Sequence, residues 1–119
     1  MRALFDTNIL IDYLEGLEPA KEEFERHPGR LVSIVSWMEL LAGAHGEEEE
    51  DVIGMFLREF RVVDVTRAIA REAVAIRSQK GLRLPDAIIW ATAHVESALL
   101  ITRNAKDFPA DAPGIRVPY

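Results

Sequence analysis

Three acidic residues in separate parts of the chain stand on otherwise apolar backgrounds. Asp6 follows an apolar start, Glu39 is the only charge in the segment SWMELLAGA, and Asp86 opens the apolar segment DAIIWATA. Gathered carboxylates without cysteine favour a hard cation with oxygen ligands, such as Mg²⁺ or Mn²⁺. Because like charges repel, such a cluster indicates a cation, which can activate water against a phosphodiester.

Each acid also has a purely structural explanation. Asp6 precedes Thr7 and Asn8, and all three residue types cap helices, although one cap would be enough. Glu39 alone fits an exposed helix position, and Asp86 in a first helical turn complements the helix dipole. A fourth polar stretch, TRNAKD after the apolar LLI, is on its own typical of a loop. The coincidence of four such segments favours function.

Short β-rich runs alternate with helical patterns, and these elements must position the acids. The patterns predict strands at 2–5, 31–35, 61–65, 99–102 and, as an edge, 115–117. They predict helices at 8–15, 20–27, 36–44, 47–60, from the Thr66 cap to Lys80 with Gly81 after it, and 85–97. Such an alternation favours a parallel sheet covered on both faces, whose sites form beyond the carboxyl ends of its strands.

Composition limits the class of protein. The 119 residues predict a single domain over 1–119, and a hydrophobic content of 49% excludes disorder. The absence of cysteine excludes disulfides, thiolate metal sites and cysteine nucleophiles. No stretch has the roughly 18 to 20 apolar residues of a membrane helix, and no basic leader is present, so we expect a cytoplasmic protein without a membrane. A net charge of −6 disfavours nucleic-acid binding unless gathered carboxylates hold cations that attract phosphate.

Several other polar residues are predicted to have no part in a site. The acidic run Glu47–Asp51 is expected to cover a helix N-terminus and its solvent face. Asp12 is expected to face solvent on the first helix. The three histidines, His27, His45 and His94, show no metal-binding or catalytic spacing.

Four segments in this order resemble the PIN-domain family, and more narrowly its VapC-type toxins of toxin–antitoxin modules: LFDTNILIDYL, SWMELLAGA, LRLPDAIIWATA and LLITRNAKDF. The resemblance implies a three-layer α/β/α sandwich around a parallel sheet of four to five strands. It implies an endoribonuclease dependent on one or two Mg²⁺ or Mn²⁺ ions, leaving 5′-phosphate and 3′-hydroxyl ends. It also implies an antitoxin that covers the site and a homodimer, with helices in 8–27 and 36–60 as candidate surfaces.

The resemblance assigns roles residue by residue. It makes Asp6, Glu39 and Asp86 the metal ligands and gives supporting roles to Thr7, Asn8 and Thr102. Basic residues near these acids are predicted to hold RNA phosphates, namely Lys80, Arg83, Arg103 and Lys106.

One position departs from the family pattern. Many members carry a fourth acid where this chain has Asn104. The amide can ligate a metal or orient a water, which keeps Asn104 among the catalytic candidates, but it adds no charge, so we expect a second metal to be held more weakly. Asp107 is expected to fix the loop.

Two other classes of function are weighed against a nuclease. A PIN-like module that binds RNA or protein without cutting is favoured only by the missing fourth acid. A phosphoryl-transfer domain is disfavoured, because a receiver needs an acidic pair at the first strand and this strand carries Asp6 alone. Haloacid-dehalogenase chemistry needs an aspartate where Asn8 stands.

Overall fold

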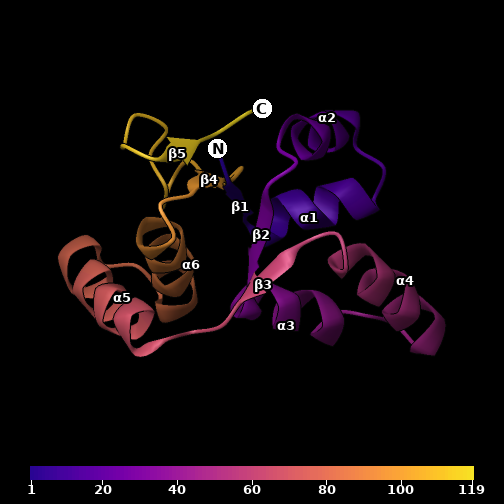
Figure 1. The fold of residues 1–119 in the computed structure, drawn as a ribbon, viewed down its shortest axis with the longest axis horizontal. Coiled ribbons are helices and arrows are strands. Elements are labelled where there is room, and N and C mark those ends of the chain that lie inside the picture. Colours follow the sequence, from indigo (N-terminus) through magenta and orange to yellow (C-terminus); the bar gives the residue numbers. More distant parts are fainter.

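Five strands and six helices alternate along residues 1–119 in the computed structural model (Figure 1). The strands are β1 (Ala3–Phe5), β2 (Arg30–Ser33), β3 (Arg61–Val63), β4 (Leu99–Ile101) and β5 (Ile115–Arg116). The helices are α1 (Thr7–Leu14), α2 (Glu18–Arg26), α3 (Ile34–Ala42), α4 (Glu47–Leu57), α5 (Arg67–Lys80) and α6 (Leu84–Val95). All strand pairs are parallel, in the order β3-β2-β1-β4-β5. The predicted α/β class is confirmed, and the sheet has five strands where four to five were predicted.

The helices form two layers because successive strand residues face opposite sides of the sheet. Ala3 and Phe5 belong to one core with apolar side chains of α1, α2, α3 and α4. Leu4, between them, belongs to the other core with side chains of α5 and α6. Figure 1 shows α5 and α6 on one side of the strands and α1 to α4 on the other. None of the helices has the length and apolar character needed to span a membrane.

Helix caps explain where the predicted boundaries were wrong. The predicted strand 31–35 ends at Ser33, whose Oγ accepts a hydrogen bond from the Val35 backbone N–H at 3.1 Å and so starts α3 two residues early. The first helix begins at Thr7, one residue early, because Asp6 is its N-cap. The helix predicted to reach residue 60 ends at Leu57.

The predicted start and end of α5 are confirmed. Thr66 caps the helix by accepting a hydrogen bond from the Ile69 backbone N–H at 3.2 Å. Gly81 follows the last residue with φ +67°, a left-handed conformation that glycine adopts without the strain of a Cβ. This sharp end lets the chain turn directly into the buried helix α6.

Aromatic side chains hold α1, α2 and α4 against the sheet. Tyr13 of α1 stacks on Phe56 of α4, with ring centroids 4.6 Å apart. Phe60, after α4, makes edge-to-face contacts at 5.7 Å with both Phe24 of α2 and Phe5 of β1. These contacts fix α1 relative to β1, and α1 carries part of the site described below.

A buried ion pair joins α2 to the last strand. Glu23 is only 3% exposed, and its two carboxylate oxygens accept hydrogen bonds from Arg116 Nε at 2.7 Å and from the terminal nitrogen Nη2 at 2.9 Å. These bonds from Arg116 lower the pKa of Glu23 below its ordinary value. The pair therefore ties the edge strand β5 to α2, which precedes it by 93 residues in the sequence.

Removing this charge should destabilise the fold. We expect Glu23→Gln to lower the free energy of unfolding by about 2 kcal/mol, since Arg116 loses a charged acceptor. Urea denaturation measures the loss, and Glu22→Gln on the exposed face of the same helix is the matched control, expected within about 0.5 kcal/mol of wild type. Because the pKa of Glu23 is lowered from 4.5, its stabilisation is present above that value and is lost as the pH falls further. An equal difference between wild type and variant at neutral pH and at about pH 3 would contradict this assignment.

Candidate functional site

The candidate site lies where the order of the strands reverses direction. From the central β1 the chain first builds β2 and β3 on one side and then crosses to β4 and β5 on the other. Beyond the carboxyl ends of such strands the flanking loops diverge and leave a crevice. Phe5 is level with Ile101 in the register, and the Asp6 backbone N–H donates to the Ile101 carbonyl at 2.9 Å. Asp6 and Thr102 thus lie side by side beyond the carboxyl ends of β1 and β4.

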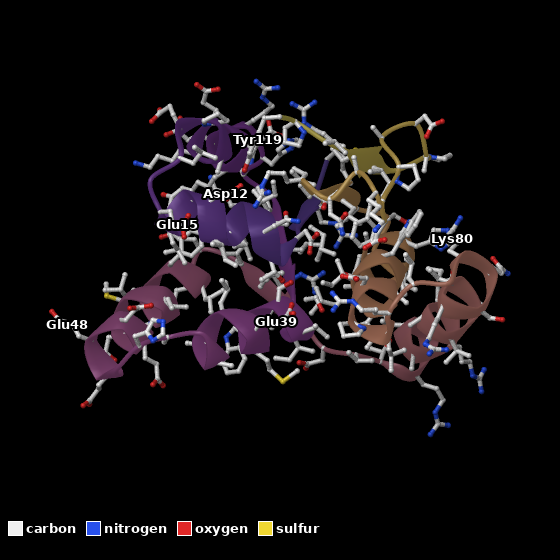
Figure 2. The ribbon with its side chains drawn as sticks, turned by 180° about the vertical axis from the view of Figure 1, so that it is seen from behind. Asp12, Glu15, Glu39, Glu48, Lys80 and Tyr119 are labelled. Carbon is white, nitrogen blue, oxygen red and sulfur yellow. The ribbon has the colours of Figure 1, made fainter.

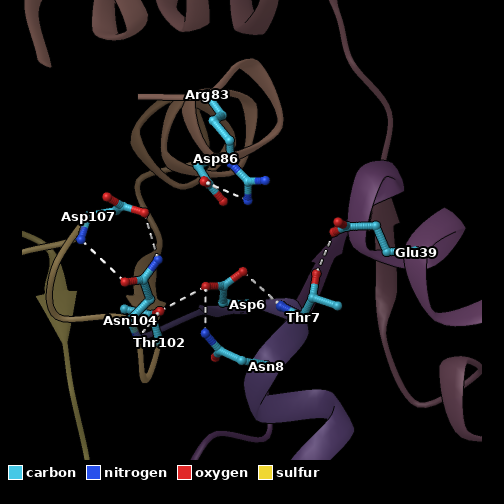
Figure 3. Close-up of polar contacts among 9 residues, drawn as sticks. All are labelled: Asp6, Thr7, Asn8, Glu39, Arg83, Asp86, Thr102, Asn104 and Asp107. Atoms are coloured by element: carbon cyan, nitrogen blue, oxygen red, sulfur yellow. Dashed lines mark hydrogen bonds and ion pairs between the residues drawn. The ribbon is translucent and has the colours of Figure 1, made fainter. Parts of the chain in front are cut away.

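Asp6 is the centre of the site (Figure 3). Its side chain is buried, and Oδ1 accepts a hydrogen bond from the Thr7 backbone N–H at 2.8 Å. Oδ2 accepts from Thr102 Oγ1 at 2.8 Å and from Asn8 Nδ2 at 3.3 Å. The predicted helix cap is confirmed, whereas the role of Asp6 as a metal ligand stays a prediction.

Burial disfavours the charged form of Asp6. It is the main reason that the pKa of Asp6 is raised from 3.8 to about 6, against the hydrogen bonds from Thr102 and Thr7, which lower it. The negative charges of Asp86 and then Glu39 raise this pKa further. The three predicted acids therefore interact electrostatically, although they are far apart in the sequence.

Glu39 reaches the site from the second turn of α3. Its Oε1 accepts a hydrogen bond from Thr7 Oγ1 at 2.8 Å, and the same hydroxyl lies 2.8 Å from Ser36 Oγ. Sequence reasoning missed Ser36, which is fully buried. Its position one helical turn before Glu39, on the same face of α3, was the available signal.

Asp86 reaches the site from the first turn of α6, whose second residue is Pro85. The prediction that the proline would occupy the first helical position was wrong by one residue. The Asp86 carboxylate lies 3.4 Å from a guanidinium nitrogen of Arg83, which immediately precedes the helix. Figure 3 shows both side chains directed toward Asp6.

Hydrogen bonds among its own residues hold the loop after β4 together. Asn104 Nδ2 donates to Asp107 Oδ2 at 3.0 Å, and its Oδ1 accepts from the Asp107 backbone N–H at 3.3 Å. Thr102 Oγ1, which donates to Asp6, accepts from the Asn104 backbone N–H at 3.0 Å. Both functional atoms of the Asn104 amide are thus engaged within the loop.

The four predicted phosphate contacts differ in their surroundings. Arg83 is beside Asp86, and Lys106 is exposed on the loop after β4. The Lys80 ammonium lies over the indole of Trp90, 4.8 Å from the ring centroid. The Arg103 guanidinium lies against Asp12, with Nε 2.8 Å from Oδ2.

The prediction that Asp12 faces solvent was wrong. Asp12 is 8% exposed, and its Oδ2 accepts hydrogen bonds from both Arg103 and the Tyr119 hydroxyl. The local sequence of α1 gave no sign of this, because both partners come from more than 90 residues along the chain. Figure 2 shows Asp12 and Tyr119 side by side.

The crevice gathers oxygen donors without completing a metal-binding arrangement. No group of three or more acidic or histidine side chains is placed to hold one metal ion. Glu39 is bonded to Thr7, and Asp86 is paired with Arg83. The donors nevertheless suit a hard cation in kind, since they are carboxylates and one of them is buried with a raised pKa that a cation would lower.

A parallel five-stranded sheet with acids beyond the ends of its strands defines the class of this protein. Residues 3–110 match the family model for the PIN domain, and the chain belongs to the PIN-domain family. Ribonuclease VapC1 of Methanocaldococcus jannaschii is 29% identical over 112 residues, which cover 90% of this chain and 79% of that protein. The resemblance predicted from four sequence segments is confirmed.

Solved structures agree with this family. A chain of a toxin–antitoxin complex from Klebsiella pneumoniae matches with a TM-score of 0.92 and 45% identity, covering 98% of each chain. DNA-bound VapBC from Salmonella typhimurium matches with a TM-score of 0.81 and 24% identity, covering 98% of this chain and 96% of the other. The second likeness is one of fold alone.

The raised pKa of Asp6 predicts a pH dependence of stability. The unfolded chain stays charged at residue 6 down to about pH 4, whereas the folded chain takes up a proton near pH 6. The folded state therefore binds more protons in this interval, and its stability rises as the pH falls. Between about pH 7.5 and pH 5 the gain should be about 1.4 kcal/mol, and Asp6→Asn should lack it.

Urea denaturation in a chelator measures this gain without divalent metal. Every other titratable group is common to both proteins, so the difference between wild type and Asp6→Asn isolates residue 6. Parallel stability curves for the two proteins would show that Asp6 has an ordinary pKa.

Proposed function

We propose that this protein is an endoribonuclease dependent on Mg²⁺ or Mn²⁺, and the toxin of a type II toxin–antitoxin module. One observation carries the proposal: Asp6 after β1, Glu39 on α3 and Asp86 on α6 come together beyond the carboxyl end of β1 (Figure 3), where Glu39 accepts a hydrogen bond from Thr7, the neighbour of Asp6. The charges of Asp86 and Glu39 raise the pKa of Asp6 accordingly. Similarity to Ribonuclease VapC1 and to a toxin–antitoxin complex supports the choice of substrate and system.

The metal ligands in this proposal are Asp6, Glu39 and Asp86. Bound there, the cation would stabilise charge on the phosphodiester and lower the pKa of the attacking water. For one or two ions to bind, Glu39 must exchange its bond to Thr7, and Asp86 its pairing with Arg83, for the cation. Each exchange replaces one side-chain contact of the acid, so we expect the fold to stay intact.

The remaining site residues hold the Asp6 carboxylate, close the loop after β4 or contact RNA phosphates. Thr7, Asn8 and Thr102 donate hydrogen bonds to Asp6, through the backbone of Thr7 and the side chains of the other two, and so hold its carboxylate in one orientation. Asn104 and Asp107 close the neighbouring loop. All four basic candidates are exposed, but Arg103 is held by Asp12 and Lys80 lies over the Trp90 ring, so we assign Arg83 and Lys106 to RNA phosphates.

A cognate antitoxin is the proposed regulatory partner. A groove of about 410 Å³ beside Glu39 suits an apolar segment of such a protein, and its apolar lining comes from α1, α3 and α4: Ile11, Leu14, Leu40, Val52 and Ile53. A partner seated there would sit next to a proposed metal ligand. We further propose that residues 1–119 act as one domain, that the protein forms a homodimer, and that it works in the cytoplasm.

A PIN-like module that binds RNA or protein without cutting is the second candidate. Two observations favour it. Asn104 stands where many family members carry an acid, and its amide is already bonded to Asp107. In addition, no three acidic or histidine side chains are placed together for one metal.

RNA cleavage tests the proposed enzyme. With Mn²⁺ and a labelled single-stranded RNA, we expect Asp6→Asn, Glu39→Gln and Asp86→Asn each to lower the cleavage rate by more than about 100-fold, beyond the loss typical of residues that only support a ligand. Glu48→Gln is the control, because this residue is exposed on α4 and points away from Glu39 (Figure 2). Equal cleavage by wild type and Asp6→Asn would end the assignment.

Calorimetric titration with Mn²⁺ separates the two candidates. The proposed enzyme should bind Mn²⁺ in the absence of RNA, and Asp86→Asn should weaken that binding because it removes a charged ligand. A non-catalytic module should show no binding that depends on Asp86. Glu48→Gln again serves as the control, since it removes the same charge at a distance.

A further inference from the structure

Arg103 directly follows Thr102, and its side chain lies against α1. Its Nε donates to Asp12 Oδ2 at 2.8 Å, and a terminal guanidinium nitrogen, Nη2, lies 3.4 Å from Oδ1. These contacts raise the pKa of Arg103 and keep it charged. The guanidinium is therefore directed at Asp12 on α1.

Asp12 receives a third hydrogen bond from the far end of the chain. The Tyr119 hydroxyl donates to Asp12 Oδ2 at 2.7 Å. Burial and then the bond to Asp12 raise the pKa of Tyr119. With donors from Arg103 and Tyr119, the buried carboxylate of Asp12 is compensated on both oxygens.

The backbone of Arg103 is anchored to the same helix. Its N–H donates to Asn8 Oδ1 at 3.2 Å. Asn8 and Asp12 are four residues apart and so lie on one face of α1. Asn8 in turn donates to Asp6 Oδ2, which also accepts from Thr102. Arg103 thus joins the loop after β4 to α1 at Asn8 and at Asp12. Of these two residues, Asn8 is itself hydrogen-bonded to the Asp6 carboxylate.

We propose that Arg103 is a positioning residue, held by Asp12 and Tyr119, that fixes the loop after β4 against α1 and so orients the side chains that hold Asp6. Its consequence for RNA cleavage rests on the proposed function. The role replaces the phosphate contact that the sequence predicted for Arg103. If this guanidinium turned to a phosphate, Asp12 would be left buried with only the Tyr119 hydroxyl, which is costly for a charged group.

Mn²⁺ affinity in the absence of RNA gives the sharpest test. Arg103→Gln and Lys106→Gln remove the same charge from the same loop, but only Arg103 has contacts with α1. Loss of a nearby positive charge by itself favours cation binding. We expect the opposite for Arg103→Gln, an affinity about 10- to 100-fold weaker, as for residues that orient metal ligands. Lys106→Gln should bind Mn²⁺ as wild type does or slightly more tightly, and equal behaviour of the two variants would overturn the proposal.

The salt dependence of RNA binding supplies a second, independent readout. Binding of a labelled single-stranded RNA is followed by fluorescence anisotropy in a chelator, which prevents cleavage. A residue that contacts one phosphate should lower the slope of log affinity against log salt by about 0.7 when it is removed. We expect this change for Lys106→Gln and no change for Arg103→Gln. A decrease in slope for Arg103→Gln would show that it contacts phosphate and would refute the positioning role.

Conservative variants guard against loss of the fold. Arg103→Lys keeps the charge but cannot form the forked contact with Asp12, and Tyr119→Phe removes a single hydroxyl. Both should stay folded by circular dichroism and weaken Mn²⁺ binding in the same direction as Arg103→Gln. Wild-type Mn²⁺ affinity in both would contradict the proposal even if Arg103→Gln does not fold.

Hydrogen exchange separates failure of this proposal from failure of the proposed function. The backbone N–H groups of Arg103 and Asn104 are bonded to Asn8 and Thr102, so Tyr119→Phe should speed their exchange, whereas Lys106→Gln should not. This readout needs neither metal nor RNA. If wild type binds no Mn²⁺ and cuts no RNA, the proposed function fails, and unchanged exchange in Tyr119→Phe would then overturn the positioning role as well.

Discussion

The architecture of the site depends on keeping one carboxylate charged in a place where burial disfavours charge. Asp6 is 5% exposed, and its pKa is raised to about 6. Hydrogen bonds from the Thr7 backbone and the Thr102 side chain offset part of that penalty, and the negative charges of Glu39 and Asp86 increase it. A bound cation would favour the charged form of all three carboxylates and so offset this penalty. Stability and the proposed chemistry therefore act in opposite directions at this residue, as is common at functional sites.

Parallel pairing of β1 with β4 brings the Thr102 hydroxyl to Asp6. Their register sets Phe5 level with Ile101, and Thr102 consequently lies beside Asp6. The same pairing carries the end of the chain back to α1 and α2. There the Arg116–Glu23 pair and the Tyr119–Asp12 hydrogen bond join the last residues to the first helices. Elements more than 90 residues apart in sequence thus support one corner of the crevice.

The basic residues show why a net charge of −6 is compatible with an RNA substrate. The Arg103 guanidinium is paired with Asp12 and the Lys80 ammonium lies over the ring of Trp90, so both charges make contacts within the protein. Arg83 is exposed beside Asp86, and Lys106 is exposed on the loop after β4. Placement of a few cations, and of metal between carboxylates, matters more for phosphate binding than the sum of charges.

The sequence by itself determined the class of fold and singled out three acids as candidates for a metal site. Alternating apolar runs predicted the parallel sheet, because a strand buried on both faces and an amphipathic helix leave different periodicities. Single charges on apolar backgrounds predicted Asp6, Glu39 and Asp86 as metal ligands. Only the tertiary structure decided the partners of these groups. Asp12 looked exposed from the pattern of α1, yet it is buried by Arg103 and Tyr119. Such contacts depend on strand register and loop closure between distant segments, which local periodicity does not encode.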